Sequence, residues 1–184
     1  MERKNFLLAT ATVIPTLLMG QSLKGSQSNR PNKGFVVKAT GSRFGEKTLL
    51  GGKNPNDIKV SNKDTNGDLT IFEYTGNEKG GPPLHIHPHQ DEIFFIVQGE
   101  YLFQVGEDMH QLKAGDTIFL PRTIPHAFAQ LTDSGKMFFL FQPSGTMEDF
   151  FRALGQLTSP PTPEQGAALF AEHGMKIVGP PLKI

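Results

Sequence analysis

The sequence lacks cysteine and tryptophan, and only two of its 184 residues are tyrosine. The absence of cysteine excludes disulfide bonds, thiolate metal ligands and cysteine nucleophiles. Aromatic residues are instead supplied by fifteen phenylalanines, whose rings require no hydrogen-bond partner. The composition therefore predicts a core that is filled largely by phenylalanine.

An excess of either charge is also missing, because 18 basic and 18 acidic side chains balance to a formal net charge of zero. Basic residues form no cluster along the chain. Nucleic-acid binding relies on clustered cations facing phosphates, so we expect no nucleic-acid partner. A hydrophobic content of 37% in a chain of this length is typical of one domain with a substantial core.

The sequence has no apolar run of the roughly 20 residues that a membrane-spanning helix needs. The apolar run at residues 6–19 is shorter, and it follows the basic residues Arg3 and Lys4. Small residues at positions 20–26 suit cleavage, so the whole arrangement is typical of an export signal.

We therefore predict an export signal at residues 1–22 and a flexible polar linker at residues 23–33. The predicted location is the periplasm of a bacterium or the surrounding medium. The order Arg3-Lys4-x-Phe6-Leu7 is similar to a twin-arginine signal in which lysine replaces one arginine. An ordinary Sec signal or an uncleaved anchor is the alternative.

Three histidines and one glutamate form the most informative pattern of the chain. His85 and His87 are two residues apart, so both point to the same face of a β-strand. Glu92 follows at an odd spacing, but Pro88 disfavours an unbroken strand, and a turn or bulge there can bring Glu92 back beside the histidines. We predict a divalent metal site formed by His85, His87, Glu92 and His126.

The apolar residues that follow Glu92 favour this interpretation. Residues 93–97 are all hydrophobic, which predicts a strand buried on both faces. A carboxylate at the head of such a strand is costly unless it is paired or coordinated. The alternative is that His85, His87 and His89 form a polar strand face with no ion.

Two segments resemble the two sequence motifs of the cupin superfamily. Residues 80–99 resemble the first motif, with two histidines and the glutamate at its spacing, and residues 115–126 resemble the second, which ends at His126. The residues between them suit the single hairpin of compact cupins. The likeness is greatest to small one-domain cupins related to quercetin dioxygenases. It is carried by Pro82-Pro83-x-His85, Asp91-Glu92-x-Phe94 and Pro125-His126-Ala127-Phe128.

The resemblance implies an all-β cupin-type barrel, also called a jelly roll or double-stranded β-helix, at residues 34–143. It also implies a C-terminal helical extension at residues 144–184 that packs on the barrel. Thr123 and Gln130 depart from the family pattern, in which glycine and asparagine are usual. Neither position is a ligand, so the departures affect the choice among cupin activities rather than the metal site.

Short segments divided by turn residues predict the strands of a sandwich or barrel. We expect strands at residues 35–39, 47–50, 58–61, 68–74, 84–87, 93–98, 100–105, 116–120, 127–131 and 137–142. A first helix is predicted at residues 146–155. Thr162 begins a capping box that predicts a second helix, with Pro163 at its first position and Gly174 as its stop. These helices either pack against the barrel or form a lid over its mouth.

Three further histidines are left outside the ligand set. His89 is either a neighbour of the ligands or exposed. His110 is expected in a polar turn, and His173 is expected near a helix end, where it interacts with the helix dipole.

Three neutral imidazoles and one carboxylate suit Fe, Mn, Ni, Co, Cu or Zn, and the order of metal affinities does not choose among them. Open positions beside such ligands are typical of non-haem oxygenases. The resemblance implies a dioxygenase that cleaves an enolic or phenolic, flavonol-like substrate with O₂, in which Glu92 is both a metal ligand and the base. Phe94, Phe103 and Phe128 line an apolar pocket or belong to the core.

Two other functions are compatible with the same residues. The first is a non-catalytic cupin that binds a metal or small ligand, and the second is a Lewis-acid isomerase. A sugar-like substrate would require inward lysine, arginine or tyrosine, whereas the inward candidates are mostly apolar, so an aromatic or enolic small molecule is favoured. Since small cupins often pair through their sheets, the resemblance also implies a homodimer.

Overall fold

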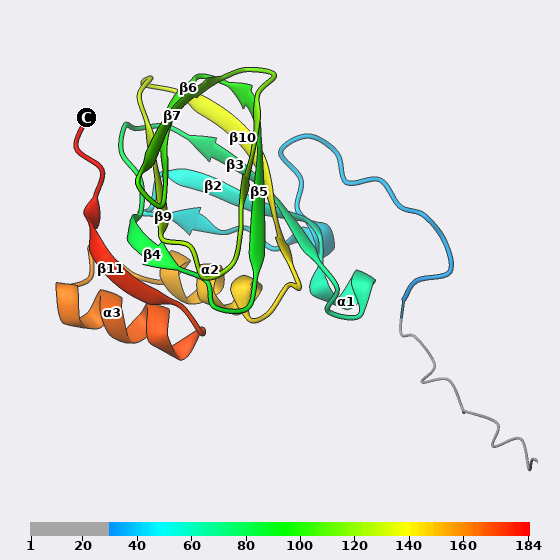
Figure 1. Ribbon diagram of the computed structural model, residues 1–184. Helices are drawn as coiled ribbons and strands as arrows, with labels where there is room; N and C mark the ends of the chain where they lie inside the picture. The colour runs from blue at the N-terminus through cyan, green and yellow to red at the C-terminus, as the bar shows by residue number, and fades with distance from the viewer. Residues whose placement is uncertain (1–29) are drawn as a thin grey trace, which may run out of the picture.

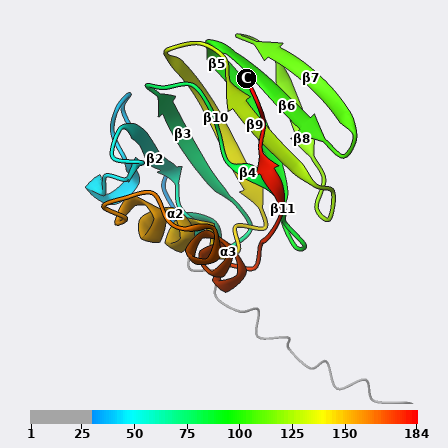
Figure 2. The ribbon, with the colours of Figure 1, turned by 90° about the vertical axis from the view of Figure 1, so that its left-hand side faces the viewer.

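The computed structural model describes residues 30–184, which form two antiparallel β-sheets that face each other (Figure 1 and Figure 2). The predicted export signal and the linker up to residue 29 lie outside these residues. One sheet has the strand order β1-β2-β3-β10-β5-β8, and the other has the order β11-β4-β9-β6-β7. The predicted all-β, cupin-type barrel with C-terminal helices is therefore confirmed.

Most strands lie at or near the predicted residues. The strands of the six-stranded sheet are β1 (Leu49–Leu50), β2 (Asn54–Val60), β3 (Thr70–Gly76), β10 (Gly135–Gln142), β5 (Asp91–Gln98) and β8 (Thr117–Leu120). Those of the five-stranded sheet are β11 (Lys176–Pro181), β4 (Pro83–Ile86), β9 (His126–Gln130), β6 (Glu100–Val105) and β7 (Asp108–Lys113). Strands β6 and β7 form the hairpin expected between the two motifs.

Phenylalanine rings fill much of the space between the sheets. Alternate residues of β3, β5 and β10 point inward, and Phe72, Phe94 and Phe139 are buried there. The ring of Phe139 stacks on Phe72 with centroids 5.1 Å apart, and on Phe94 with centroids 5.3 Å apart. These contacts confirm the predicted phenylalanine-rich core.

Part of the outward face of the six-stranded sheet is also apolar. Along β5 the side chain of Phe94 is buried, whereas Phe95 is 43% and Val97 47% exposed. The prediction that residues 93–97 form a strand buried on both faces is therefore wrong, because the strand alternates between the core and the surface. Phe119 of the neighbouring strand β8 is 54% exposed. We call Phe95, Val97 and Phe119 the outer apolar face.

The strand predicted at residues 35–39 is absent, because this segment pairs with no other strand of the described chain. Val36 is 79% exposed. The ring of Phe35 lies against the guanidinium of Arg43, with 3.9 Å between Cζ and the ring centroid. The Phe35 ring is thus packed by a cation–π contact on the surface and not by neighbouring strands of a sheet.

Two strands, both at the edges of the five-stranded sheet, were not predicted from the sequence. Strand β7 is mostly exposed and polar, so it lacks an apolar alternation. It contains His110, which is therefore in a strand and not in the predicted polar turn. Strand β11 contains Pro180 and Pro181, which only an edge strand tolerates readily.

The described residues contain four short helical segments. They are a 3₁₀ helix (Arg43–Gly45), α1 (Asn62–Thr65), α2 (Met147–Gly155) and α3 (Pro163–Glu172). Helix α1 connects β2 and β3, and Ser61 and Asp64 form a capping box that nucleates this helical turn. None of the helices in residues 30–184 is long and apolar enough to cross a membrane.

Helices α2 and α3 lie together beneath the barrel in Figure 1. The capping box predicted at the start of α3 is present, because Thr162 accepts from the backbone N–H of Gln165 and the Gln165 side chain accepts from that of Thr162. Gly174 follows the helix with a φ of 79°, as its predicted role of helix stop requires.

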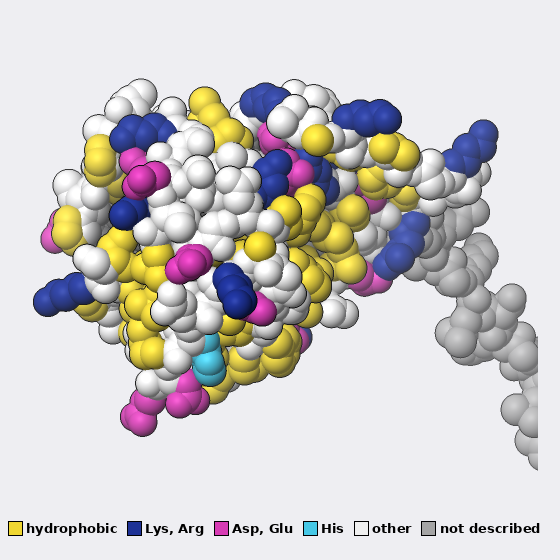
Figure 3. Space-filling model, turned by 90° about the horizontal axis from the view of Figure 1, so that it is seen from above, with side chains coloured by type: hydrophobic (Ala, Val, Ile, Leu, Met, Phe, Trp, Pro, Cys, Tyr) yellow, Lys and Arg dark blue, Asp and Glu magenta, His cyan; other side chains and the backbone are white. Residues whose placement is uncertain are grey.

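The surface carries both charges side by side. Figure 3 shows acidic and basic side chains interspersed on the face seen from above. Elsewhere they form ion pairs, as between Lys53 and Glu78 at 2.8 Å and between Arg122 and Asp91 at 2.6 Å.

Candidate metal centre

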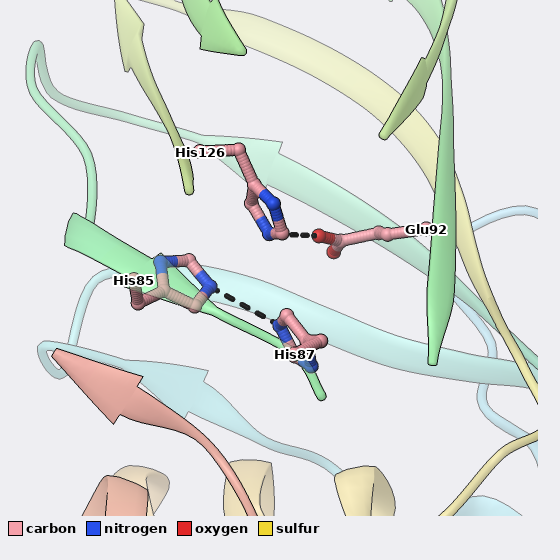
Figure 4. A group of neighbouring side chains, drawn as sticks. All are labelled: His85, His87, Glu92 and His126. Atoms are coloured by element: carbon pink, nitrogen blue, oxygen red, sulfur yellow. Dashed lines mark hydrogen bonds and ion pairs between the residues drawn. The ribbon is translucent and has the colours of Figure 1, made fainter. Parts of the chain in front are cut away.

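The four predicted ligands come from both sheets (Figure 4). His85 lies on β4, His87 directly after it, and His126 at the start of β9, opposite His85 in the register. Glu92 lies on β5 of the facing sheet. The turn predicted at Pro88 is present as a bend, but it carries the chain from one sheet to the other. Glu92 therefore approaches the histidines from the opposite side of the barrel.

The ligand atoms of these residues converge on one point. One nitrogen or carboxylate oxygen from each of the four side chains lies within 4.8 Å of the other three. Nε2 of His85 is 3.1 Å from Nε2 of His87, and Nε2 of His126 is 3.4 Å from Oε2 of Glu92. All four residues are buried.

Backbone carbonyls orient two of the imidazole rings. Nδ1 of His85 donates to the carbonyl of Pro83 at 2.8 Å, and Nδ1 of His126 donates to the carbonyl of Ile124 at 2.9 Å. A carbonyl only accepts, so the proton of each neutral ring is on Nδ1 and the lone pair is on Nε2. Nε2 of His126 is buried and has no hydrogen-bond partner among the described residues. Converging lone pairs and a carboxylate are a donor set that fits a divalent cation.

Burial keeps the imidazoles of His85 and His87 neutral. Burial, with a smaller effect of the neighbouring His126, lowers the pKa of His85 to about 3. Burial, followed by the effects of His85 and His126, lowers the pKa of His87 to about 2. Burial also raises the pKa of Glu92, against the opposing effect of His126. At neutral pH the rings of His85 and His87 are thus in the neutral form that binds metals.

Thr123 holds the backbone of His87 in place. Its N–H donates to the His87 carbonyl at 2.9 Å. Its φ of 69° lies in the left-handed region, where a β-branched residue is strained and glycine is favoured. The departure from the usual cupin glycine therefore preserves the turn at some cost in strain.

Gln90 is a neighbour of the site that the sequence did not reveal. Its Oε1 is buried without a hydrogen-bond partner in the described chain, and so is Nδ1 of His87. The Gln90 side chain also acts to raise the pKa of His87, which places the amide beside that ring. It is the side chain beside His87 that can accept a hydrogen bond from Nδ1 of that ring, as the carbonyls of Pro83 and Ile124 do for the other two rings.

We expect Gln90→Leu to weaken metal binding by about 10–100-fold, as is typical when an outer partner of a ligand histidine is lost. Titration of the metal-free protein with Zn²⁺ or Mn²⁺ would measure the change. Gln90→Glu retains an acceptor oxygen and should bind the metal nearly as tightly as the original protein. Equal affinities for all three proteins would show that Gln90 does not orient His87.

A cavity of about 910 Å³ lies beside the four side chains, between the sheets. Of the three phenylalanines for which pocket and core were both open, Phe94 and Phe128 line the cavity, whereas Phe103 does not and is fully buried in the core. The C-terminal elements also line the cavity, including Phe150 of α2 and Phe170 of α3. The ring of Phe170 contacts that of His85, with centroids 5.3 Å apart. The helices thus both pack against the barrel and form one wall of its cavity.

The remaining histidines lie away from the centre. His89 and His110 are exposed. His173 follows α3, and its Nδ1 donates to the carbonyl of Leu169 at 2.9 Å, which fits its predicted place at a helix end.

The two tyrosines provide a pH-dependent test of the interior. Burial, then the Glu78 carboxylate, raises the pKa of Tyr74 to about 12, and burial also raises that of Tyr101. When folding raises the pKa of a phenol, that phenol contributes fully to the stability of the fold below its pKa in the unfolded chain, which is about 10. The contribution is lost as the pH rises through the pKa of the phenol in the folded protein. We expect little tyrosinate absorbance until the protein unfolds at alkaline pH. Titration near pH 10 in a protein that circular dichroism shows to be folded would contradict this burial.

Two facing antiparallel sheets that enclose three histidines and a glutamate define a β-barrel with a buried candidate metal centre. Residues 71–142, which include all four candidate ligands, match the family model for the cupin domain. The chain thus carries a cupin domain at residues 71–142.

Curated relatives match parts of the chain. The chain is 27% identical over 107 residues to quercetin 2,3-dioxygenase of Bacillus subtilis. The aligned residues make up 58% of this chain and 32% of that protein. The chain is also 30% identical over 57 residues to an uncharacterised protein of Streptomyces coelicolor. These aligned residues make up 30% of this chain and 54% of that protein. The chain thus spans about a third to a half of the length of these relatives.

Solved structures share the fold. KdgF from Halomonas sp. superposes with a TM-score of 0.51 at 18% identity, over 60% of this chain and 94% of that chain. A predicted oxalate decarboxylase from Thermotoga maritima also has a TM-score of 0.51 and 18% identity, over 59% of this chain and 99% of that chain. At these identities the likeness establishes the barrel architecture alone.

Proposed function

We propose that this cupin is a metal-dependent dioxygenase that cleaves an enolic or phenolic, flavonol-like small molecule with O₂. The observation that carries the proposal is the apolar cavity that adjoins the buried cluster of three histidines and one glutamate. The partial match to quercetin 2,3-dioxygenase of Bacillus subtilis supports the same reaction class. Both oxygen atoms of O₂ enter the organic product, so the reaction needs no external reductant.

His85, His87, Glu92 and His126 would hold a divalent transition metal, which is Fe, Mn, Ni, Co, Cu or Zn. When bound, such an ion supplies a Lewis acid with open positions for an enol oxygen and dioxygen. The backbone carbonyls of Pro83 and Ile124 fix the rings of His85 and His126, so that their lone pairs are in place before the ion binds.

Glu92 is suited to act as the base as well as a ligand. Its burial raises the pKa of its carboxyl group, and a carboxylate with a raised pKa is a stronger base for a weakly acidic hydroxyl. The side chain enters from the sheet opposite His85 and His87, so it can approach a substrate hydroxyl from the other side of the cavity.

The cavity determines the class of molecule that fits. Its volume lies in the range typical of sites for drug-sized ligands. Aromatic side chains line much of it, and such a lining excludes water and favours an aromatic ligand over a sugar.

The test of this function is oxygen consumption with quercetin by the protein loaded with each of the six metals in turn. We expect Glu92→Gln to keep much of its metal and to lower turnover by roughly a hundredfold, because the base is lost. Glu100→Gln, on the exposed side of β6, should leave turnover unchanged. Unchanged turnover in Glu92→Gln would exclude Glu92 as the base. No oxygen uptake with any metal would instead favour a cupin that binds its ligand without reaction.

Export to the periplasm or the medium and assembly as a homodimer stand as further proposals. The outer apolar face supports the second, because Phe95, Val97 and Phe119 expose apolar area on adjacent strands of one sheet.

A further inference from the structure

The only two tyrosines of the chain lie at the same level of the barrel, away from the metal centre. Phe141 of β10 pairs with Glu92 on one side and Thr70 on the other, which places Thr70 at the level of the candidate ligands. Tyr74 lies four residues further along β3, a distance of roughly 13 Å along a strand. In the facing sheet, Tyr101 pairs with Gln130, four residues beyond His126.

The two tyrosine hydroxyls have different surroundings. Tyr101 is completely buried, and its hydroxyl donates to Oε1 of Gln130 at 3.2 Å. Tyr74 lines the cavity, and within residues 30–184 its hydroxyl makes no hydrogen bond. The ring of Tyr74 packs edge-on against Phe128, with centroids 6.2 Å apart, so the hydroxyl is held on a fixed ring. A largely buried hydroxyl with no protein partner is available to a ligand in the cavity.

The other polar groups near this end of the cavity already have partners. Glu78 and Asn54 both line it, but Glu78 accepts from Lys53 at 2.8 Å and from Asn54 at 3.3 Å. Oδ1 of Asn54 accepts from the backbone N–H of Asn77 at 2.8 Å. Tyr74 is therefore the polar side chain at this level that combines contact with the cavity and an unused hydrogen-bonding group.

The wall between the two polar ends is apolar. Phe94 and Phe139 occupy the register level between Glu92 and Tyr74, and Phe128 completes this part of the lining. A ligand that reaches both ends must therefore carry oxygen substituents at its two extremities and a flat apolar body between them. A molecule of two or three fused or linked rings has this form, whereas a single ring is too short.

We propose that Tyr74 is a specificity-determining residue that hydrogen-bonds a hydroxyl or carbonyl group of a multi-ring phenolic ligand, at the end remote from the metal centre. This inference rests on the proposed function, because it assumes that the opposite end of the ligand lies at His85, His87, Glu92 and His126.

The experiment compares two ligands and two variants of the full chain. Quercetin carries hydroxyl groups on its outer rings, and 3-hydroxyflavone has the same ring system with only the metal-binding oxygen pair. Binding of both is measured with metal-free and metal-loaded protein. Tyr74→Phe should weaken the binding of quercetin about three- to tenfold, the effect of one neutral hydrogen bond, and should change that of 3-hydroxyflavone less than about twofold.

Tyr101→Phe is the matched control, because it removes a hydroxyl at the same level that is bonded to Gln130 and does not line the cavity. It should change the binding of the two ligands equally. Since Tyr74→Phe keeps the ring on Phe128, its melting temperature should stay near that of the original protein.

The outcomes separate this inference from the proposed function. Equal effects of Tyr74→Phe on both ligands, or no effect on either, would overturn the role of Tyr74 even if quercetin drives oxygen uptake. A selective loss of quercetin binding without oxygen uptake in any protein would support Tyr74 and overturn the dioxygenase.

Discussion

Replacing His87 by alanine is expected to abolish tight metal binding while the barrel stays folded. His87 supplies one of the four converging ligand atoms, 3.1 Å from Nε2 of His85. Loss of a ligand should weaken binding by more than the roughly 10–100-fold that follows loss of an outer partner. The phenylalanine core does not depend on this ring, so the variant should still unfold cooperatively. Metal content after dialysis and thermal unfolding together measure the two effects.

His89→Ala is the control for this experiment, because His89 lies two residues away and is exposed. It should retain a full complement of metal. If His87→Ala also retained all of its metal, the proposed ligand set would be wrong. If His87→Ala were unfolded without metal while the original metal-free protein was folded, the assumption that the core stabilises the barrel independently would be wrong.

Replacing Glu148 by alanine is expected to cause the largest loss of stability, about 3 kcal/mol. Glu148 of α2 is 1% exposed. Its carboxylate accepts from the hydroxyls of Ser61 at 3.1 Å and Thr70 at 2.9 Å, and from Arg152 at 3.2 Å. Alanine would remove the acceptor of the Ser61 hydroxyl and of the Asn62 N–H, whereas the Thr70 hydroxyl keeps the Val60 carbonyl as an acceptor at 3.0 Å. Arg152 keeps its ion pair with Glu46, so the loss should lie at the low end for a broken buried pair.

Urea unfolding measures this change, and Asp149→Ala is the neighbouring control. The Asp149 side chain is 66% exposed and pairs only with Arg152 among the described residues. Its removal should change the free energy of unfolding by less than about 1 kcal/mol. Equal effects of the two substitutions would show that the contacts of Glu148 do not hold α2. Because α2 supplies Phe150 to the cavity wall, Glu148→Ala should also weaken ligand binding.

The strands could be predicted because turn residues separate short apolar segments, and the motif resemblance predicted the barrel. Apolar residues run without a break through parts of β5 and β10, so alternation did not distinguish the inward Phe94 from the outward Phe95. The edge strands β7 and β11 could not be predicted in this way, since exposed or proline-containing edges have no apolar alternation. At residues 35–39 the apolar composition was misleading, because pairing with a sheet depends on a neighbouring strand that the local sequence does not encode.

The spacing of His85 and His87 predicted that they share a strand face, and the motif resemblance added Glu92 and His126. Neither the histidine spacing nor the motif resemblance could specify that Glu92 approaches from the facing sheet, because the position of Glu92 depends on the path of the chain after Pro88. Gln90 and Tyr74 were missed for a related reason. A lone glutamine or tyrosine in a sequence gives no sign that its polar group is buried beside a ligand or directed into a cavity.

The alternation of β5 has a consequence for protein engineering. Glu92 points into the barrel, and its neighbour Ile93 is paired with the exposed Phe119 across the β5–β8 ladder. The same two backbones that carry the outer apolar face therefore set the position of the carboxylate. Substitutions of Phe95 or Phe119 that are made to improve solubility would alter the strands that position Glu92. The metal content of such variants should be measured before they are regarded as silent.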